Sequence, residues 1–519
     1  MTTYDQIPYS IHCYPSSAPE HMSAVAKLFG VSSAALSSAR VLELGCASGG
    51  NLIPLAARYP QASFTGIDLS QKQIDTARSL VAELNLKNIE FEAKAIQNCS
   101  FKNQSFDFII VHGVYSWVSS DVQESILKLC DACLSENGIA YVSYNTLPGW
   151  NASKTVRDML LYHDRSFSEH DERILEAQRM LNFVSENITE ATGYYKNEID
   201  LEIQRIAQQD QSYLFHEYLE EVNDPCYFHE FMEKAQKFGL DYLGDADVTT
   251  MYSGNQKEFA SNKLSQIESI VQQEQYIDFL TNRRFRKTYL VKNATKIDRN
   301  VSASDVDGLF LTPLYNINST QSGDEPNLDE TLDLVNASDS NRTATLKGKY
   351  HCACYTQLLI SAPIPLTGTE LVAAVNAHNP EMPVDEIQQA WNEIVLELLF
   401  RGIIDITAAK TQVVKVASDK PCVSEVARLI GLNSNLVPNM KHELIRLPED
   451  SRVIMQYVNG VNTMDDICNF VKGHIDKGDI TLSADGTPIA KNSPELEVNI
   501  KPYVDAHLTL FSINSLLVG

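Results

Sequence analysis

The stretch VLELGCASGGNL (residues 41–52) has the pattern of a buried strand that passes through a glycine turn into a helix. The apolar residues of VLEL suit a strand covered on both faces, and the glycines at 45, 49 and 50 supply the tight turn that a strand-to-helix crossover needs. In α/β proteins ligands bind at the carboxyl ends of such strands. The stretch therefore predicts an α/β fold with a ligand site at this turn.

The residues around the turn indicate which ligand it holds. A dinucleotide fingerprint would have a glycine where this chain has Ala47, so a pyrophosphate would meet a Cβ atom at its closest approach to the backbone. Glu43 would repel a phosphate but attract the cationic amino-acid end of S-adenosylmethionine (AdoMet). Asp68 ends the next apolar strand, in SFTGIDLS, where a carboxylate accepts hydrogen bonds from ribose hydroxyls. Together these residues favour AdoMet over NAD.

Strand and helix patterns continue to alternate up to residue 145. They comprise the strands IEFEAKAI, FDFIIVHG and IAYVSYN and the helices QKQIDTARSLVAEL and DVQESILKLCDACL. The pattern predicts a Rossmann-like, doubly wound parallel sheet, with Glu43, Asp68, residues 112–117 and residues 144–145 around one crevice. Cys130 and Cys133 form a CxxC, but no second CxxC completes a metal site, so we expect both thiols to pack in the core and no metal to be bound.

Length and charge limit the remaining possibilities. A chain of 519 residues implies about three domains at roughly 150 residues each. Its net charge of −25 argues against general nucleic-acid binding, which needs a basic face. We see neither a signal peptide nor a membrane span, so a cytoplasmic protein is expected.

The pattern changes after the predicted sheet. Amphipathic helices dominate up to about residue 281, and NRRFRKTYLVK (282–292) then predicts a strand with a basic cluster at Arg283, Arg284, Arg286 and Lys287. We interpret that cluster as a solvated or ion-paired structural face, with contact to an acidic substrate as the alternative. The predicted domains are a sheet domain over 1–150, a helical domain over 151–317, an acidic linker or mobile loop over 318–340, and smaller α+β modules of winged-helix character over 341–519.

Several longer motifs resemble one enzyme family. They are YDQIPY (4–9), VLELGCASGGNLIPLA (41–56), HGVYSWV (112–118), VSYNTLPGW (142–150) and LFHEYLEEVNDPCYFHEF (214–231). This set resembles the bacterial class I methyltransferases that carry a methyltransferase regulatory domain, a group that includes the rickettsial-type lysine methyltransferases of outer-membrane proteins. The resemblance is specific over roughly the first 300 residues. It implies an AdoMet-binding domain, a helical regulatory or dimerisation region, and a C-terminal region that engages the acceptor, so a homodimer is a further prediction.

The resemblance also assigns cofactor contacts by position. It gives Glu43, Gly45, Ala47, Gly49 and Asn51 to the methionine end of AdoMet, Asp68 and Leu69 to the ribose and adenine, and His112 and Gly113 to the sulfonium side. The family often has an acidic residue for the adenine amine where this chain has Ala95, so Gln97 or a backbone carbonyl would take that role. Tyr9, in the N-terminal segment, would close over the cofactor as part of a lid, or else that segment is simply packed.

Methyl transfer requires a neutral nucleophile aligned with a sulfonium and shielded from water. We expect Tyr115, Trp117 and Tyr144 to form aromatic walls around the methyl donor, and Tyr144 or Asn145 to orient an acceptor amine. The alternative is that these aromatic residues belong to the core. His216 and Glu217 are further candidates for a general base, although such a helical pair is more often found at a surface or a helix cap.

Three classes of function fit these features. The first is transfer of a methyl group to an amine, above all the side-chain nitrogen of lysine in a protein acceptor such as a surface or outer-membrane protein. The second is a small-molecule N- or O-methyltransferase, and the third is a non-enzymatic regulator that binds AdoMet. Because every AdoMet motif lies in the first 150 residues, we expect cofactor binding without the C-terminal half and acceptor placement with it.

Overall fold

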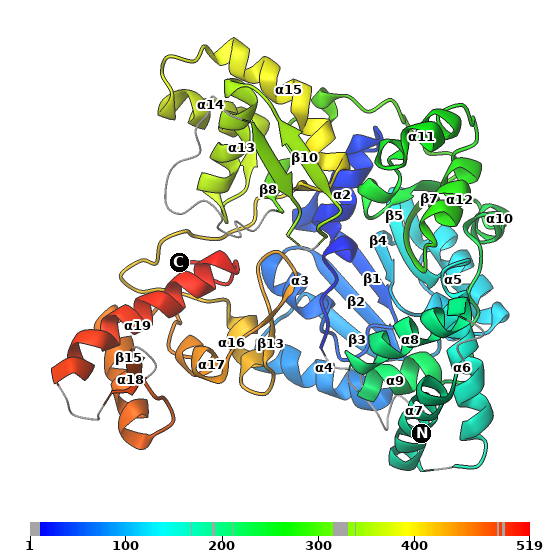
Figure 1. The fold of residues 1–519 in the computed structure, drawn as a ribbon, viewed down its shortest axis with the longest axis horizontal. Coiled ribbons are helices and arrows are strands. Elements are labelled where there is room, and N and C mark those ends of the chain that lie inside the picture. The colour runs from blue at the N-terminus through cyan, green and yellow to red at the C-terminus, as the bar shows by residue number, and fades with distance from the viewer. Residues whose placement is uncertain are drawn as a thin grey trace.

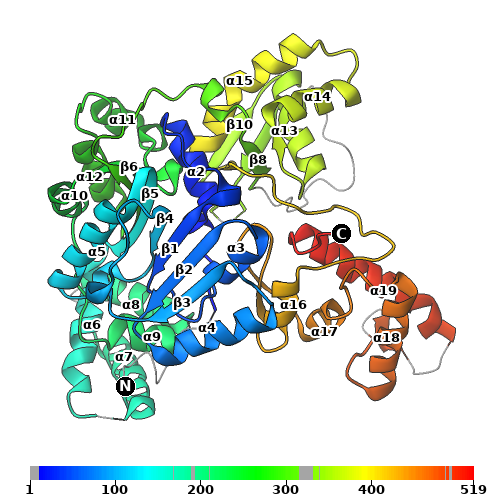
Figure 2. The ribbon, with the colours of Figure 1, turned by 180° about the vertical axis from the view of Figure 1, so that it is seen from behind.

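The structure is a computed structural model that describes residues 11–167, 169–188, 193–209, 211–314, 331–337, 339–484, 487–489 and 494–519. A central sheet with its helices is flanked by a unit containing α13–α15 and by a C-terminal unit containing α16–α19 (Figures 1 and 2). The N-terminal helix α2 (Pro19–Leu28) lies between the sheet and the first of these units.

The central sheet has seven strands in the order β3-β2-β1-β4-β5-β7-β6. Their bounds are Arg40–Leu44 for β1, Ser63–Asp68 for β2, Ile89–Ala93 for β3, Phe106–Val111 for β4, Leu134–Asn145 for β5, Leu240–Asp245 for β6 and Phe285–Lys292 for β7. Strands β1 to β5 are parallel, and β7 is antiparallel to both of its neighbours. The predicted Rossmann-like fold class is confirmed.

Apolar side chains explain why this sheet forms. Every residue of β4 is buried, as its continuous run FDFIIV requires of a central strand. One face of the sheet packs against α2, while α5 (Ser120–Cys133) and α10 (Phe228–Lys237) cover the other. Cys130 and Cys133 are buried in α5, which confirms core packing for both thiols.

The crossover helices position the strand ends that form the site. Helix α3 (Leu52–Arg58) follows the glycine turn, and α4 (Gln71–Glu83) follows β2. Ser70 caps α4, because its hydroxyl accepts a hydrogen bond of 3.2 Å from the Gln73 amide. These helices fix where β1 and β2 stop, and both strands stop at the same edge of the sheet.

Residues 151–317 differ from the predicted helical domain. The helices α6 (Asn151–Asp164), α7 (His170–Asn187), α8 (Gly193–Ala207) and α9 (Gln211–Tyr218) share an apolar core of their own. Beyond them, α10, α11 (Glu258–Leu264) and α12 (Ile270–Thr281) alternate with strands β6 and β7, which complete the central sheet. The strands form here because the far edge of β5 would otherwise leave its backbone groups unpaired.

The unit that follows continues the core of the sheet domain. It contains β8 (Phe310–Pro313), β9 (Leu332–Val335), β10 (Thr343–Leu346), α13 (Lys349–Ser361), β11 (Leu366–Thr367), α14 (Gly368–His378), α15 (Val384–Phe400) and β12 (Ile404–Thr407). The acidic stretch predicted as a linker over 318–340 is partly structured, because β9 within it pairs with β10. Residues 315–330 and 338 of this region lie outside the described residues.

The C-terminal unit has a separate apolar core. Its elements are α16 (Glu425–Gly431), β13 (Leu436–Pro438), β14 (Leu444–Arg446), α17 (Glu449–Met455), α18 (Met464–Lys477), β15 (Ser483–Ala484), β16 (Thr487–Pro488) and α19 (Pro494–Ile513). Its first helix, α16, packs beside α3 of the sheet domain. Short helices and two two-stranded hairpins make up this unit, as the predicted winged-helix character requires.

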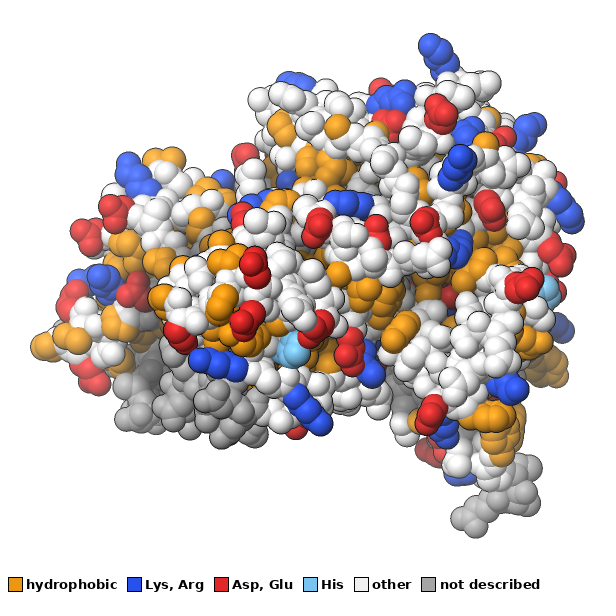
Figure 3. Space-filling model, turned by 90° about the horizontal axis from the view of Figure 1, so that it is seen from above, with side chains coloured by type: hydrophobic (Ala, Val, Ile, Leu, Met, Phe, Trp, Pro, Cys, Tyr) orange, Lys and Arg blue, Asp and Glu red, His pale blue; other side chains and the backbone are white. Residues whose placement is uncertain are grey.

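Charges of both signs are interspersed on the face shown in Figure 3. Among the described residues, no helix is both long and apolar enough to cross a membrane.

The predicted basic cluster is an ion-paired structural face. Arg286 is fully buried, with its guanidinium 2.9 Å from Glu274 and 2.8 Å from Asp278. Arg283 lies 3.0 Å from Asp278, and Arg284 lies 2.8 Å from Glu202. These pairs join β7 and the residues just before it to α12 and α8, so they hold β7 in place between β5 and the edge strand β6.

We expect Arg286→Ala to destabilise the fold strongly, because it leaves the buried carboxylate of Glu274 without its ion-pair partner and leaves Asp278 with Arg283 alone. The loss should be about 3 to 5 kcal/mol, measured as the free energy of unfolding in urea. Lys154→Ala is the matched control, since its pair with Asp158 is exposed and should contribute about 0 to 1 kcal/mol. Equal, small losses in the two variants would contradict a structural role for Arg286.

Candidate cofactor and acceptor site

The glycine turn after β1 adopts a backbone conformation that ordinary residues avoid. Gly45 has φ +81°, and a Cβ atom there would overlap the side chain of Val114. Ala47 also has a positive φ, +46°, so it occupies a conformation usually taken by glycine. The turn is thereby kept tight, and the amides of Gly45 and Cys46 both donate to the Ile67 carbonyl, at 2.7 and 3.0 Å.

Asp68 connects the end of β2 to this turn. Its Oδ2 atom accepts a hydrogen bond of 2.9 Å from the Ala47 amide, and its Oδ1 atom accepts one of 2.9 Å from the Ser70 amide. Two backbone donors therefore hold the carboxylate in one orientation beside the turn. Leu69, next to it, leaves 58% of its surface exposed, so an apolar face is available at the same edge.

The predicted adenine contacts lie at the end of β3. Gln97 is exposed in the 3₁₀ turn η3 (Ile96–Asn98), and Ala95 directly precedes that turn. Both residues are at the edge of the sheet where Asp68 lies, because β2 and β3 are parallel neighbours. The structure thus brings Gln97 to the expected side of the crevice, while its contact with adenine stays a prediction.

Glu43 is a buried carboxyl with one oxygen left unused. It is 2% exposed, and its Oε1 atom accepts a hydrogen bond of 2.8 Å from the Asn51 side-chain amide. Its Oε2 atom is buried with no hydrogen-bond partner among the described residues. Burial raises the pKa of Glu43 to about 8, against the lowering effect of Asn51. Such a group favours a cationic donor, and this matches the ammonium end of AdoMet.

The N-terminal segment packs directly on the turn. The Tyr14 amide donates to Asn51 Oδ1 at 3.1 Å, and the Cys13 thiol donates to the Gly50 carbonyl at 3.3 Å. The predicted lid residue Tyr9 lies outside the described residues. Sequence analysis did not single out Cys13 or Tyr14, and only their closeness to YDQIPY could have drawn attention to them.

His112 and Gly113 follow β4, on the side predicted for the sulfonium. The His112 ring stacks on Tyr14 with centroids 3.5 Å apart, and its Nδ1 atom lies 2.7 Å from the Tyr141 hydroxyl. Burial lowers the pKa of His112 to about 3, so the ring is neutral and adds no positive charge beside a cationic donor. Gly113 is exposed, and no atom lies within 4 Å of the position a Cβ would take. A ligand therefore has room there.

Tyr115 and Tyr144 lie in the core. Tyr144 is 1% exposed, its ring stacks on Phe231 at 4.1 Å, and its hydroxyl is 3.0 Å from the Thr288 hydroxyl. Tyr115 is also buried and meets Phe231 edge to face at 5.1 Å. Their burial supports the alternative that these rings are core residues, because α10 covers the face of the sheet toward which both rings point.

Trp117 and Asn145 remain candidates for the acceptor side. Trp117 is half-buried in the 3₁₀ turn η4 (Tyr115–Trp117) and meets Trp150 edge to face at 6.5 Å. The Arg157 guanidinium lies 5.9 Å from the Trp117 ring. Asn145 ends β5, and its Nδ2 atom is buried without a partner among the described residues. Whether Trp117 and Asn145 contact the acceptor stays a prediction.

His216 and Glu217, the predicted pair on α9, lie in different environments. His216 is buried, not exposed, and its Nδ1 atom lies 3.1 Å from the carboxylate of Glu220. Glu217 is half-buried, and burial raises the pKa of its carboxyl to about 7, against the lowering effects of Arg157 and Arg284. The Tyr14 side chain interacts electrostatically with both Glu43 and Glu217. Glu217 thus lies within electrostatic range of Tyr14, the residue whose ring stacks on His112.

A residue from the C-terminal unit also reaches this site. His442, in the turn between β13 and β14, has its Nε2 atom 2.7 Å from Asn51 Oδ1. The sequence offers no local signal for this contact, because 391 positions separate the two residues. Among the described residues, no group of three or more His, Cys, Asp or Glu side chains is arranged to hold a metal ion.

Comparison with known families agrees with this architecture. Residues 41–138 match a methyltransferase domain, and residues 210–292 match a predicted methyltransferase regulatory domain. Residues 419–516 match the family described as the C-terminal winged helix domain of PKMT. Three separate parts of the chain thus correspond to parts of one kind of enzyme.

Full-length relatives lead to the same assignment. The uncharacterized protein RP789 of Rickettsia prowazekii is 36% identical over 99% of this chain and 93% of its own length. The structure of PKMT2 from Rickettsia typhi has a TM-score of 0.89 at 30% identity, covering 98% of this chain and 100% of that one. PKMT2 in complex with AdoHcy has a TM-score of 0.88 at 29% identity, covering 99% of this chain and 100% of that one. The chain belongs to the family of rickettsial PKMT-type class I methyltransferases, with AdoMet as its cofactor.

Proposed function

We propose that this methyltransferase transfers the methyl group of AdoMet to the side-chain nitrogen of lysine in a protein acceptor. The observation that carries the proposal is the likeness to PKMT2 over the whole chain, which includes the winged helix domain named for PKMT. The size of the chain supports it, because the chain extends far beyond the methyltransferase domain matched over residues 41–138. The units beyond the sheet are available to hold a macromolecular acceptor.

We place the cofactor at the edge of the sheet where β1 and β2 end. Glu43 Oε2, buried and unpartnered within the described chain, would accept the ammonium of the methionine part. Asp68, held by the amides of Ala47 and Ser70, would accept the ribose hydroxyls. Gly113 leaves open space on the sulfonium side. These groups fit a ligand that is cationic at one end and a nucleoside at the other.

We place the acceptor lysine on the side of Trp117 and Glu217. A lysine reaches the donor as an ammonium and has to lose a proton before its lone pair attacks. Glu217 supplies a half-buried carboxylate for that proton, and its pKa of about 7 suits a base at neutral pH. The Trp117 ring provides an aromatic face for the cationic amine.

The reaction itself is a displacement at carbon. The lone pair of the lysine nitrogen forms a bond to the methyl carbon as the carbon–sulfur bond breaks, and its electrons return to sulfur. The sulfonium becomes the neutral thioether of AdoHcy, and the proton lost by the amine passes to Glu217 and then to solvent. Alignment of the two reactants contributes about 7 to 11 kcal/mol of such a barrier, and the protein's main task is to provide that alignment.

The cofactor assignment predicts that Asp68→Ala and Glu43→Gln weaken AdoMet binding. Loss of charge-assisted hydrogen bonds should cost about 1.5 to 3 kcal/mol, or roughly tenfold or more in Kd measured by calorimetry. Since the pKa of Glu43 is about 8 in the free protein, its carboxyl is protonated at pH 7 and has to release a proton when it pairs with an ammonium.

Calorimetry at pH 7 in buffers of different ionisation enthalpy should therefore detect proton release on AdoMet binding. The release should be lost in Glu43→Gln and kept in Glu92→Gln, an exposed control on β3. Proton release of equal size in the wild type and in Glu43→Gln would refute this role for Glu43.

The acceptor assignment predicts a rate of methyl transfer that rises with pH through the neutral range. Lysine has an unperturbed pKa of about 10.4, so its reactive neutral form increases with pH. Glu217 becomes a proton acceptor only above its pKa of about 7, and this acts in the same direction. Glu217→Gln should lower the rate about 10²- to 10⁴-fold while AdoMet affinity is kept. The exposed neighbour Glu221 is the control, as Glu221→Gln should keep both. Normal turnover in Glu217→Gln would remove Glu217 from the mechanism.

The acceptor class is tested by incubating the purified protein with isotopically labelled AdoMet and two fractions of a bacterial lysate, proteins and small molecules. We expect label on lysine side chains of protein, located by tandem mass spectrometry, and none with Asp68→Ala. Label confined to the small-molecule fraction would contradict the proposal and favour a small-molecule N- or O-methyltransferase.

A further inference from the structure

The turn between β13 and β14 is built to present one buried side chain. Its backbone is held by Asn439, whose Oδ1 atom accepts hydrogen bonds of 2.9 Å from the amides of Lys441 and Glu443. His442 lies between them at φ +63°, a left-handed conformation that is unfavourable for a residue other than glycine. Its side chain is nevertheless fully buried. A strained turn residue that points into another unit indicates a role for the side chain itself.

The contacts of His442 determine which nitrogen carries its proton. The Asn51 amide donates to Glu43, so Asn51 Oδ1 is the acceptor that faces His442 Nε2 at 2.7 Å. On the other side of the ring, Nδ1 lies 3.5 Å from the guanidinium of Arg58, which can only donate. Both neighbours therefore select the neutral ring with its proton on Nε2. Burial, and the charge of Arg58, lower the pKa of His442 well below its ordinary value, which agrees with this form.

Asn51 is the point at which three distant parts of the chain meet. Its Oδ1 atom accepts from the Tyr14 amide at 3.1 Å as well as from His442, and its Nδ2 atom donates to Glu43 Oε1 at 2.8 Å. The Asn51 Nδ2 atom also lies 3.0 Å from the Ser17 hydroxyl, so the N-terminal segment and His442 hold the Asn51 side chain together. The orientation of Glu43 thus depends in part on a hydrogen bond that begins in the C-terminal unit.

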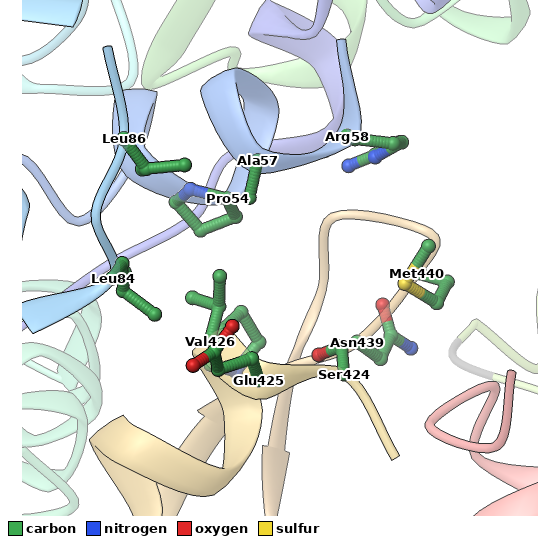
Figure 4. Close-up of a pocket in the computed structure, with 11 residues that line it drawn as sticks. Pro54, Ala57, Arg58, Leu84, Leu86, Ser424, Glu425, Val426, Asn439 and Met440 are labelled. Carbon is green, nitrogen blue, oxygen red and sulfur yellow. The ribbon is translucent and has the colours of Figure 1, made fainter. Parts of the chain in front are cut away.

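The turn that carries His442 is not closely packed against α3. The hydrogen bond from His442 to Asn51 is therefore not replaced by apolar contacts at this place. A cavity of about 240 Å³ lies between α3 and the C-terminal unit. Figure 4 shows Asn439 and Met440 of the turn on one side of it and Pro54 and Ala57 of α3 on the other. Val426 and Ile430 of α16 still join the core of the sheet domain, so the two units remain docked without His442.

We propose that His442 is a positioning residue of the AdoMet site, which fixes Asn51 and through it the carboxylate that receives the ammonium of the cofactor. The C-terminal unit then completes the cofactor site in addition to any part it has in holding the acceptor. This inference rests on the proposed role of Glu43. It departs from the expectation, drawn from the sequence, that cofactor binding needs only the first 150 residues.

The test compares two ligands that differ only where His442 would act. AdoMet carries the amino-acid end, and 5′-methylthioadenosine lacks it but keeps the adenosine and the sulfur. In the full-length protein, His442→Gly removes the side chain at a φ that glycine adopts freely. We expect calorimetry to show AdoMet bound about three- to tenfold more weakly and methylthioadenosine bound as in the wild type. His442→Gln, which offers an amide donor to Asn51, should recover most of the AdoMet affinity.

Two further variants keep the test decisive. Lys441→Ala changes the neighbouring residue of the same turn and should bind both ligands normally. His442→Asn tolerates a positive φ but is too short to reach Asn51, so it takes the place of His442→Gly if that variant does not fold. Wild-type AdoMet affinity in these His442 variants, or an equal loss for both ligands, would overturn the proposal. Unchanged AdoMet affinity in Glu43→Gln would instead overturn the role of Glu43. If AdoMet binds more weakly to Glu43→Gln but normally to the His442 variants, the role of Glu43 stands and only the role of His442 is overturned.

Discussion

A carboxyl group buried with one unused oxygen is the constraint around which the site is organised. Glu43 sits at the end of β1 with Oε1 bound by Asn51 and Oε2 without a partner in the described chain. Burying such a group is unfavourable unless it is paired, and the cost appears here as a pKa raised to about 8. A cationic ligand relieves that cost, so the fold stores a preference for the charged end of AdoMet before any ligand arrives.

The parts that enclose this carboxyl come from the whole length of the chain. Glu43 lies beside the glycine turn. The segment around Tyr14 packs on that turn from the N-terminal side, and the turn that carries His442 contacts it from the C-terminal unit. The seven-stranded sheet, held at its edge by the buried pairs of Arg286, fixes where these parts converge. Cofactor binding and the docking of the C-terminal unit are therefore energetically coupled in our account, because one hydrogen-bond chain includes both.

The sequence predicts well what depends on local pattern and less well what depends on distant contacts. Strands β1 to β5 and the glycine turn follow from apolar runs and turn residues, and Glu43 and Asp68 lie where that pattern places them. The sequence did not place β6 and β7 in the sheet, because β7 pairs with β5 across more than 100 residues and β6 joins the sheet only through β7, and such distant pairings leave no periodic signal. Tyr144 shows the same limit: the end of its strand is predictable, but the cover that α10 gives its ring is not.

A structure of this protein crystallised with AdoHcy would show whether Glu43 receives the amino group of the ligand. We expect an oxygen of Glu43 within hydrogen-bond distance of that amino group, with Asn51 still bound to both Glu43 and His442. An amino group bound elsewhere, with Glu43 Oε2 still unpartnered or with His442 turned away from Asn51, would contradict it.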